Sequence, residues 1–225
     1  VDRNFEAEVP EGCDTQVDIA QQLVMAMDNG LIDVAFGGGR RNFVDESMEI
    51  EEGTTGRRSD GRNLIDEAQE MGVQYAWNQE TFDALSLDGS SPILGLFESS
   101  HMMYEADRAD EPSLAEMTEA AIKALSGNEN GMILMVEAGR VDHANHAGNA
   151  ARVVRDQKAF ADAVAIADEL TDDEDTLIIV TADHEHAVAF NGYCGRGSNI
   201  LGLCMEINND GIETTGEPIL ADDGK

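Results

Sequence analysis

Short apolar runs alternate along this chain with longer stretches in which apolar residues recur every three or four positions. The runs predict buried strands, and the spaced stretches predict amphipathic helices. Strands that alternate with helices favour a parallel sheet covered on both faces. We therefore expect an α/β fold, a three-layer sandwich with a mostly parallel central sheet, in a single domain over residues 1–225.

The pattern assigns most of the chain to nine elements. Strands are expected at 31–36, 73–77, 92–97, 132–136 and 176–180. Helices are expected at 14–28, 62–71, 112–126 and 143–170, with Pro112 in the first turn of the third. Polar segments at about 45–60 and 98–112 are expected to be surface loops, and the tail from 207 shows little periodicity.

The composition adds a strong acidic bias. Lys and Arg number 14 against 46 Asp and Glu, which gives a net charge of −32. Such a charge disfavours binding to nucleic acid and to anionic membranes, because both are recognised through Lys and Arg. We interpret it as an acidic, halophile-like surface adapted to high salt, and binding of cations by a few of the carboxylates is compatible with this. No run is apolar and long enough to span a bilayer.

The three cysteines leave two interpretations open. Cys194 and Cys204 flank a Gly-rich stretch and would close a loop in an oxidising compartment, which favours a periplasmic or secreted protein. Three reduced thiols are equally compatible, and Cys13 has no partner in either case. Because the chain opens with Val1 rather than Met, we expect a removed leader or a longer parent chain.

Histidines and carboxylates concentrate directly after two of the expected strands. One segment reads V-E-A-G-R-V-D-H-A-N-H and ends at His146, and the other reads T-A-D-H-E-H and ends at His186. They hold four of the five histidines, and His101 stands apart. Carboxylate oxygen and imidazole nitrogen suit Zn²⁺ and Mg²⁺, and open α/β sheets build their sites at strand carboxyl ends. The pattern predicts a hydrolytic metal centre.

The spacing within these segments indicates candidate ligands. Asp142 and His146 are four residues apart, so on a helix they share one face. Asp183 and His184 are adjacent, where a turn after a strand can direct both to one ion. Glu137 follows its strand directly and suits the harder Mg²⁺.

These segments resemble the alkaline phosphatases, secreted zinc and magnesium phosphomonoesterases. V-E-A-G-R-V-D-H-A-N-H-A is similar to the family's V-E-G-G-R-I-D-H-x-H-H, and T-A-D-H-E-H is similar to its T-A-D-H-S-H. Segments such as G-C-D-T-Q-V-D-I-A, L-G-L-F-E and G-Y-C-G-R-G-S-N-I-L-G-L agree in the same order. The similarity reaches about Leu203 and is closest to the animal-like branch of the family.

The resemblance implies a role for each candidate residue. Two Zn²⁺ and one Mg²⁺ are implied, with Asp142 and His146 on the first zinc, Asp183 and His184 on the second, and Glu137 on magnesium. His186 holds a ligating carboxylate by a hydrogen bond, His143 touches phosphate through water, and Arg3 grips the substrate phosphate bidentately. An additional Ca²⁺ is implied at the Phe97 carbonyl, Glu98 and Glu111, with a further acid among Glu49, Glu51 and Glu52.

The family's serine nucleophile lies in an Asp-Ser-Ala motif that this chain does not contain. The family places that motif upstream of Arg3 and places a last zinc histidine beyond Lys225. The resemblance therefore implies that this chain is the central part of an incomplete domain. We expect hydrolysis of small phosphomonoesters at alkaline pH, through a phosphoserine, from the complete homodimeric enzyme, and no turnover from this chain alone. A related phosphodiesterase or sulfatase and a non-catalytic, acidic cation-binding fragment are the alternatives.

Overall fold

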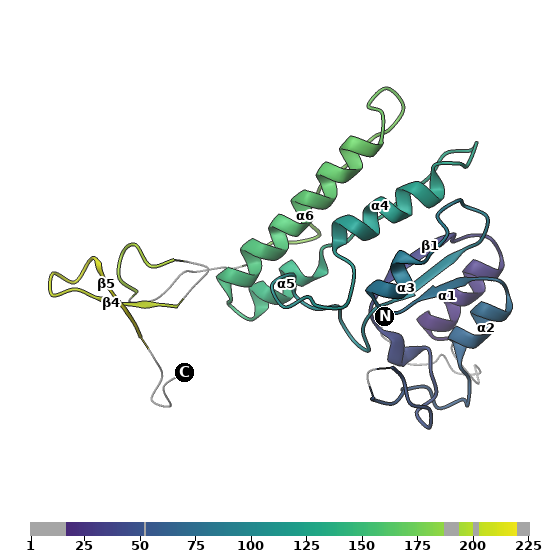
Figure 1. Cartoon of the computed structure of the whole chain (residues 1–225), viewed down its shortest axis with the longest axis horizontal. Helices are drawn as coiled ribbons and strands as arrows, with labels where there is room; N and C mark the ends of the chain where they lie inside the picture. The colour runs from purple at the N-terminus through teal and green to yellow at the C-terminus, as the bar shows by residue number, and fades with distance from the viewer. Residues whose placement is uncertain (1–16, 52, 187–193, 200–202, 220–225) are drawn as a thin grey trace, which may run out of the picture.

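Three parallel strands form the sheet at the centre of the fold. The computed structural model describes residues 17–51, 53–186, 194–199 and 203–219. The strands β1 (Val34–Gly37), β2 (Gln74–Ala76) and β3 (Ile93–Leu96) lie in the order β1–β3–β2, and the expected parallel sheet is confirmed (Figure 1). Along the chain they alternate with α-helices and a short 3₁₀ helix, η1. In chain order these are α1 (Ile19–Asp28), η1 (Arg40–Asn42), α2 (Leu64–Glu70), α3 (Gln79–Asp83), α4 (Leu114–Leu125), α5 (Gly139–His146) and α6 (Ala150–Leu170).

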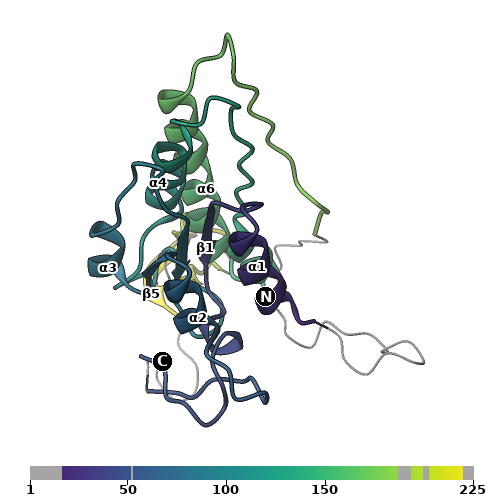
Figure 2. The same ribbon diagram turned by 90° about the vertical axis from the view of Figure 1, so that its right-hand side faces the viewer.

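Helices cover both faces of this sheet because its side chains alternate between them. Leu94 and Leu96 pack into the core formed with α1 and α2, whereas Phe36, Ala76 and Phe97 pack into the core formed with α3 and α4. Figure 2 shows α1 and α3 on opposite sides of β1. The three layers that the apolar pattern predicts are therefore present around β1, β2 and β3.

Side-chain caps fix where the helices begin. Asp18 accepts a hydrogen bond from the Gln21 N–H (3.0 Å), so α1 begins at residue 19 rather than at 14. Ser113 and Glu116 form a capping box at the start of α4. Pro112 therefore precedes the N-cap, and its expected place inside the first helical turn is wrong.

The single helix expected over 143–170 is two helices. Between α5 and α6, Gly148 adopts φ of +62°, in the left-handed region that ends a helix. Asn149 then begins α6 by accepting a hydrogen bond from the Arg152 N–H (3.1 Å). This break lets α6 pack beside both α4 and α5 (Figure 1).

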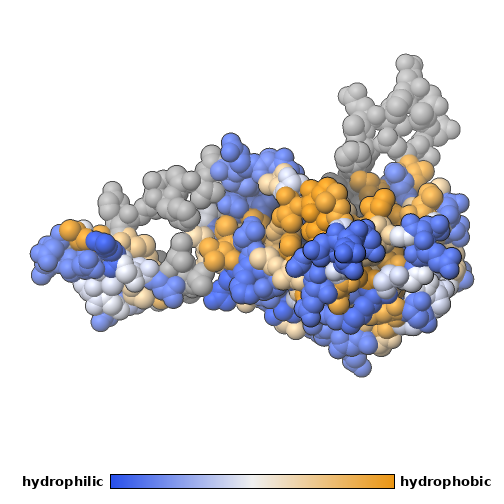
Figure 3. Space-filling model, turned by 90° about the horizontal axis from the view of Figure 1, so that it is seen from above, coloured by the Kyte–Doolittle hydropathy of each residue, from blue (hydrophilic) through white to orange (hydrophobic). Residues whose placement is uncertain are grey.

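Two of the five expected strands do not form. Residues 132–136 and 176–180 have no regular secondary structure, and Ile133 and Leu177 are 99% and 82% exposed. A buried strand needs hydrogen-bonding neighbours and cover on both faces, and in the described part of the chain neither lies beside these runs. Exposed apolar side chains are visible among the hydrophilic ones on the face shown in Figure 3.

A two-stranded antiparallel sheet occupies the tail, where no element was expected. It consists of β4 (Met205–Ile207) and β5 (Thr214–Pro218). The Asn208 side chain accepts hydrogen bonds from the N–H groups of Asp210, Ile212 and Glu213, which organises the turn between the strands. Cys194 and Cys204 form a disulfide beside this sheet, which decides between the two interpretations of those cysteines. Among the described helices, none has the length and apolarity to cross a bilayer.

Candidate metal centre

Three candidate ligands from distant parts of the chain meet beside α5. Asp142 lies on α5, while His184 and His186 lie in the extended segment after residues 176–180. One ligand atom from each of the three lies within 4.8 Å of the others. Carboxylate and imidazole are the groups that bind Zn²⁺ or hold its ligands in place, so the set of side chains fits a zinc site.

Asp142 is at the centre of this group. The His186 Nε2 lies 2.6 Å from Asp142 Oδ1, and the His184 Nε2 lies 3.6 Å from the same oxygen. The hydrogen bond from His186 keeps the pKa of Asp142 below its usual value, and the charges of His146, His186 and His184 add to this effect. An ionised carboxylate only accepts, so His186 donates through Nε2–H. That is the contact expected of a residue that holds a ligating carboxylate in place.

His146 and Asp183 lie at the margin of the group. His146 Nε2 is 3.5 Å from Asp142 Oδ2, one helical turn away, and its ring meets the His186 ring edge-on at 4.7 Å. Asp183 Oδ2 is 3.4 Å from His184 Nε2, although the Asp183 side chain is 87% exposed. The sequence therefore identified the residues that meet here, whereas their assignment to two separate zinc ions remains a prediction.

The other expected site residues lie in different places. Glu137 is exposed, in the segment before α5, and is not in the group formed by Asp142, His184 and His186. Arg3, like Cys13, lies outside the described residues. His143, on α5, contacts His101 and Arg140.

His101, which stands apart in the sequence, lies next to His143 in the structure. Their rings meet edge-on with centroids 4.4 Å apart. Burial and the neighbouring charges of His143 and Arg140 lower the pKa of His101. Sequence reasoning missed this pair because the 98–112 segment has no periodicity that would place His101 relative to α5.

Glu98 and Glu111 form the second candidate cation site, close to the carboxyl end of β3. Glu111 is only 2% exposed, and its Oε1 accepts a hydrogen bond from the Met103 N–H (2.8 Å). Its Oε2 is buried without a hydrogen-bond partner among the described residues. Burial, and then the charge of Glu98, raise the pKa of Glu111 to about 7. A buried carboxylate oxygen without a partner, beside a second carboxylate, fits a hard cation such as Ca²⁺.

The remaining candidates for this cation differ in their surroundings. Glu51 already forms an ion pair with the buried Arg40 (3.1 Å), which competes with binding to a cation. Glu52 lies outside the described residues. Phe97 directly follows β3, and its N–H donates to the Gly37 carbonyl across the sheet (2.8 Å).

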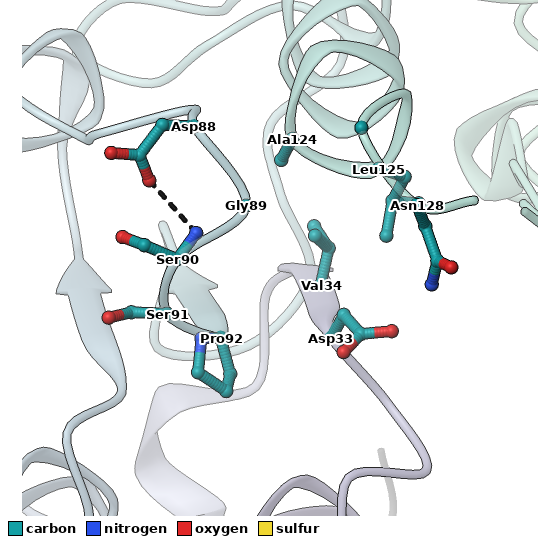
Figure 4. Close-up of a pocket in the computed structure, with 11 residues that line it drawn as sticks. Asp33, Val34, Asp88, Gly89, Ser90, Ser91, Pro92, Ala124, Leu125 and Asn128 are labelled. Carbon is teal, nitrogen blue, oxygen red and sulfur yellow. Dashed lines mark hydrogen bonds between the residues drawn. The ribbon is translucent and has the colours of Figure 1, made fainter. Parts of the chain in front are cut away.

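A cavity of about 350 Å³ lies at the opposite ends of the strands. Asp33 and Pro92, which precede β1 and β3, line it together with Ala124 and Leu125 at the end of α4 (Figure 4). No candidate metal ligand lines this cavity. The chemistry suggested by the histidines is therefore concentrated beside α5 and not in this hollow.

Comparison with known proteins places these residues in context. The family model described as alkaline phosphatase matches residues 2–218. A membrane-bound alkaline phosphatase of Bombyx mori is 43% identical over 204 residues, which cover 86% of this chain and 36% of that protein. The tissue-nonspecific isozyme of Felis catus is 39% identical over 211 residues, which cover 88% of this chain and 39% of that protein.

The structural comparison points in the same direction. The crystal structure of Thermus thermophilus alkaline phosphatase is similar with a TM-score of 0.54 and 31% identity, and the match covers 66% of this chain and 30% of that one. This chain thus spans less than two-fifths of the length of each of these relatives.

Proposed function

Because this chain belongs to the alkaline phosphatase family, we propose that it is part of a metal-dependent enzyme that hydrolyses phosphate monoesters at alkaline pH. The observation that carries the proposal is the convergence of Asp142, His184 and His186, whose ligand atoms lie within 4.8 Å of one another although the first two are 42 positions apart in the sequence. Such a convergence of carboxylate and imidazole groups supports a metal site more strongly than either motif does alone.

In the proposed site, Asp142 and His146 bind one Zn²⁺, Asp183 and His184 bind a second, and Glu137 binds Mg²⁺. When bound, such ions stabilise negative charge on phosphoryl oxygens and activate an oxygen nucleophile. Within this chain, the hydrogen bond from His186 holds the Asp142 carboxylate in a fixed orientation.

Substrate binding is assigned to Arg3 and His143. A guanidinium group can grip two phosphate oxygens at once, and an imidazole can donate to a third. The serine that would carry the phosphoryl group in the complete enzyme is not assigned here, because the 225 residues contain no Asp-Ser-Ala motif. We therefore expect no substrate turnover by this chain alone.

The proposal includes a calcium site at the Phe97 carbonyl, Glu98 and Glu111. The disulfide between Cys194 and Cys204 supports a periplasmic or secreted location, because such bonds persist in oxidising compartments. The homodimer expected of the complete enzyme rests on the family resemblance.

Metal analysis tests the proposal. The purified chain is dialysed against Zn²⁺ and Mg²⁺, and bound metal is measured by mass spectrometry and titration calorimetry. Asp142→Asn and His184→Gln are expected to weaken Zn²⁺ binding about tenfold or more, and His186→Gln about 10- to 100-fold. Asp162→Asn, at an exposed position on α6, is the matched control.

Three results would contradict parts of the proposal. If none of these three substitutions weakens Zn²⁺ binding, then Asp142, His184 and His186 do not form the metal centre. Binding of Ca²⁺ alone, spread over surface acids, would instead favour an acidic cation-binding protein. Hydrolysis of a simple aryl phosphate by the isolated chain would show that its expected inactivity is wrong.

A further inference from the structure

Tyr104 connects the 98–112 loop to α5, which carries Asp142, and to α6, which comes next along the chain. The guanidinium carbon of Arg140, on α5, lies 4.0 Å from the centre of the Tyr104 ring, and that of Arg152, on α6, lies 4.3 Å from it. An aromatic face attracts a guanidinium group through its negative electrostatic potential. One ring thus holds two arginines from two helices.

Each of the two arginines at this ring also interacts with a carboxylate. Arg152 also forms an ion pair with Asp107 (2.8 Å), another residue of the loop. Arg140 interacts electrostatically with Asp156, a buried carboxylate on α6 that accepts a hydrogen bond from the Glu105 N–H (3.3 Å). Arg140 is therefore held by stacking on the aromatic ring, and the negative charge of Asp156 favours its guanidinium at this place.

Arg140 in turn contacts His143, one helical turn further along α5. Its Nη1 lies 3.0 Å from His143 Nδ1. A guanidinium group only donates hydrogen bonds, so Nδ1 of His143 must be the acceptor in this pair. In the neutral imidazole the proton is then on Nε2.

We infer that Tyr104 and Arg140 are positioning residues that lock His143 in its Nε2–H tautomer. A ring locked in this way presents a hydrogen-bond donor at Nε2, on the residue that follows Asp142, rather than the lone pair that a metal ion requires. This agrees with the absence of His143 from the group of three candidate ligands. The inference deepens the proposed function, because the partner suited to that donor is an oxyanion of the substrate phosphate.

Nuclear magnetic resonance of the intact chain tests the inference without metal or turnover. Histidine labelled with ¹⁵N gives long-range ¹H–¹⁵N patterns that distinguish the two neutral tautomers. The measurement is made near pH 8, and the His143 signals are assigned from their loss in His143→Gln. We expect the Nε2–H pattern for His143 in the unaltered chain.

The variants separate positioning from general structure. Tyr104→Phe keeps the aromatic face and is expected to keep the Nε2–H pattern, whereas Tyr104→Leu is expected to yield both tautomers. Arg140→Met removes the donor to Nδ1 and is expected to do the same. Arg152→Met is the matched control, because Arg152 contacts the same ring but not His143.

A His143 that carries its proton on Nδ1 would overturn the inference, and so would an Nε2–H pattern unchanged in Arg140→Met. Titration with inorganic phosphate serves as a separate measurement. A shift of the His143 signals, with apparent affinity reduced about fivefold or more in Arg140→Met, supports the donor role. A locked tautomer that does not respond to phosphate would contradict the proposed phosphate site while leaving the positioning intact.

Discussion

Replacing Glu111 with Gln is expected to stabilise the cation-free chain, and to do so more as the pH rises. Glu111 is 2% exposed and its pKa is raised to about 7, from 4.5 for an ordinary glutamate. The ionised form is therefore disfavoured in the folded state. At low pH the group is protonated in both states and costs nothing. As the pH rises from 4.5 to about 7, the unfolded chain releases this proton before the folded protein does, so the folded protein loses stability.

The size of the effect follows from the two pKa values. A rise from 4.5 to about 7 corresponds to a loss of about 3 kcal/mol at pH 8.5, and most of it develops between pH 5 and 8. Glutamine keeps the shape and the acceptor for the Met103 N–H but carries no charge. The free energy of unfolding gained by Glu111→Gln over the unaltered chain should therefore be about 2–3 kcal/mol larger at pH 8.5 than at pH 5.

Urea unfolding followed by circular dichroism, with chelator present, measures this difference. Glu129→Gln, at an exposed position, is the control and should show no such trend. Added Ca²⁺ should stabilise the unaltered chain most at pH 8.5 and have a weaker effect on Glu111→Gln. A stability difference between Glu111→Gln and the unaltered chain that is the same at both pH values would refute the reasoning.

Three further outcomes are expected. Arg58→Met should destabilise the chain by about 1–3 kcal/mol in urea unfolding, because it leaves Asp18 and the partly exposed Asp60 without their shared, buried partner; a cost below about 0.5 kcal/mol would contradict this. Gly95→Ala should lower the unfolding free energy by about 1–3 kcal/mol, since an added Cβ would lie 2.5 Å from the Phe97 ring, and an unchanged urea midpoint would show that the core yields. Added NaCl should raise the thermal midpoint, because it screens the repulsion within a chain of net charge −32, and a midpoint that falls steadily between 0.1 and 2 M would argue against an acidic surface adapted to salt.

Apolar patterning predicted the sheet well but could not say which runs find neighbours. The run that forms β3 and the run at 176–180 are both short and apolar, yet only the first is flanked by strands. An apolar pattern indicates that a segment favours burial, whereas a strand also requires a neighbouring strand to hydrogen-bond with. Gly148 and Asn149 contained the signal for the break between α5 and α6, because glycine favours a helix end and asparagine a helix start.

The candidate site could be predicted in part for a similar reason. Asp142 and His184 follow apolar runs whose carboxyl ends were expected to meet, and the two side chains do lie together although the runs form no strands. The contact between His101 and His143 depends on the path of an irregular loop. The stacking of Arg140 on Tyr104 depends on that same path, which no sequence period describes.

The exposed runs at 132–136 and 176–180 have a consequence for solubility. Both are rich in Ile, Leu, Met or Val and contain no charged residue, and their backbone can template pairing with another copy of the chain. At low ionic strength, the net charge of −32 keeps two copies apart. At about 0.1 M salt that repulsion already decays within about 10 Å. Salt that weakens charge repulsion within one molecule thus also weakens the repulsion between molecules. The chain should therefore stay monodisperse only within a limited range of salt and protein concentration.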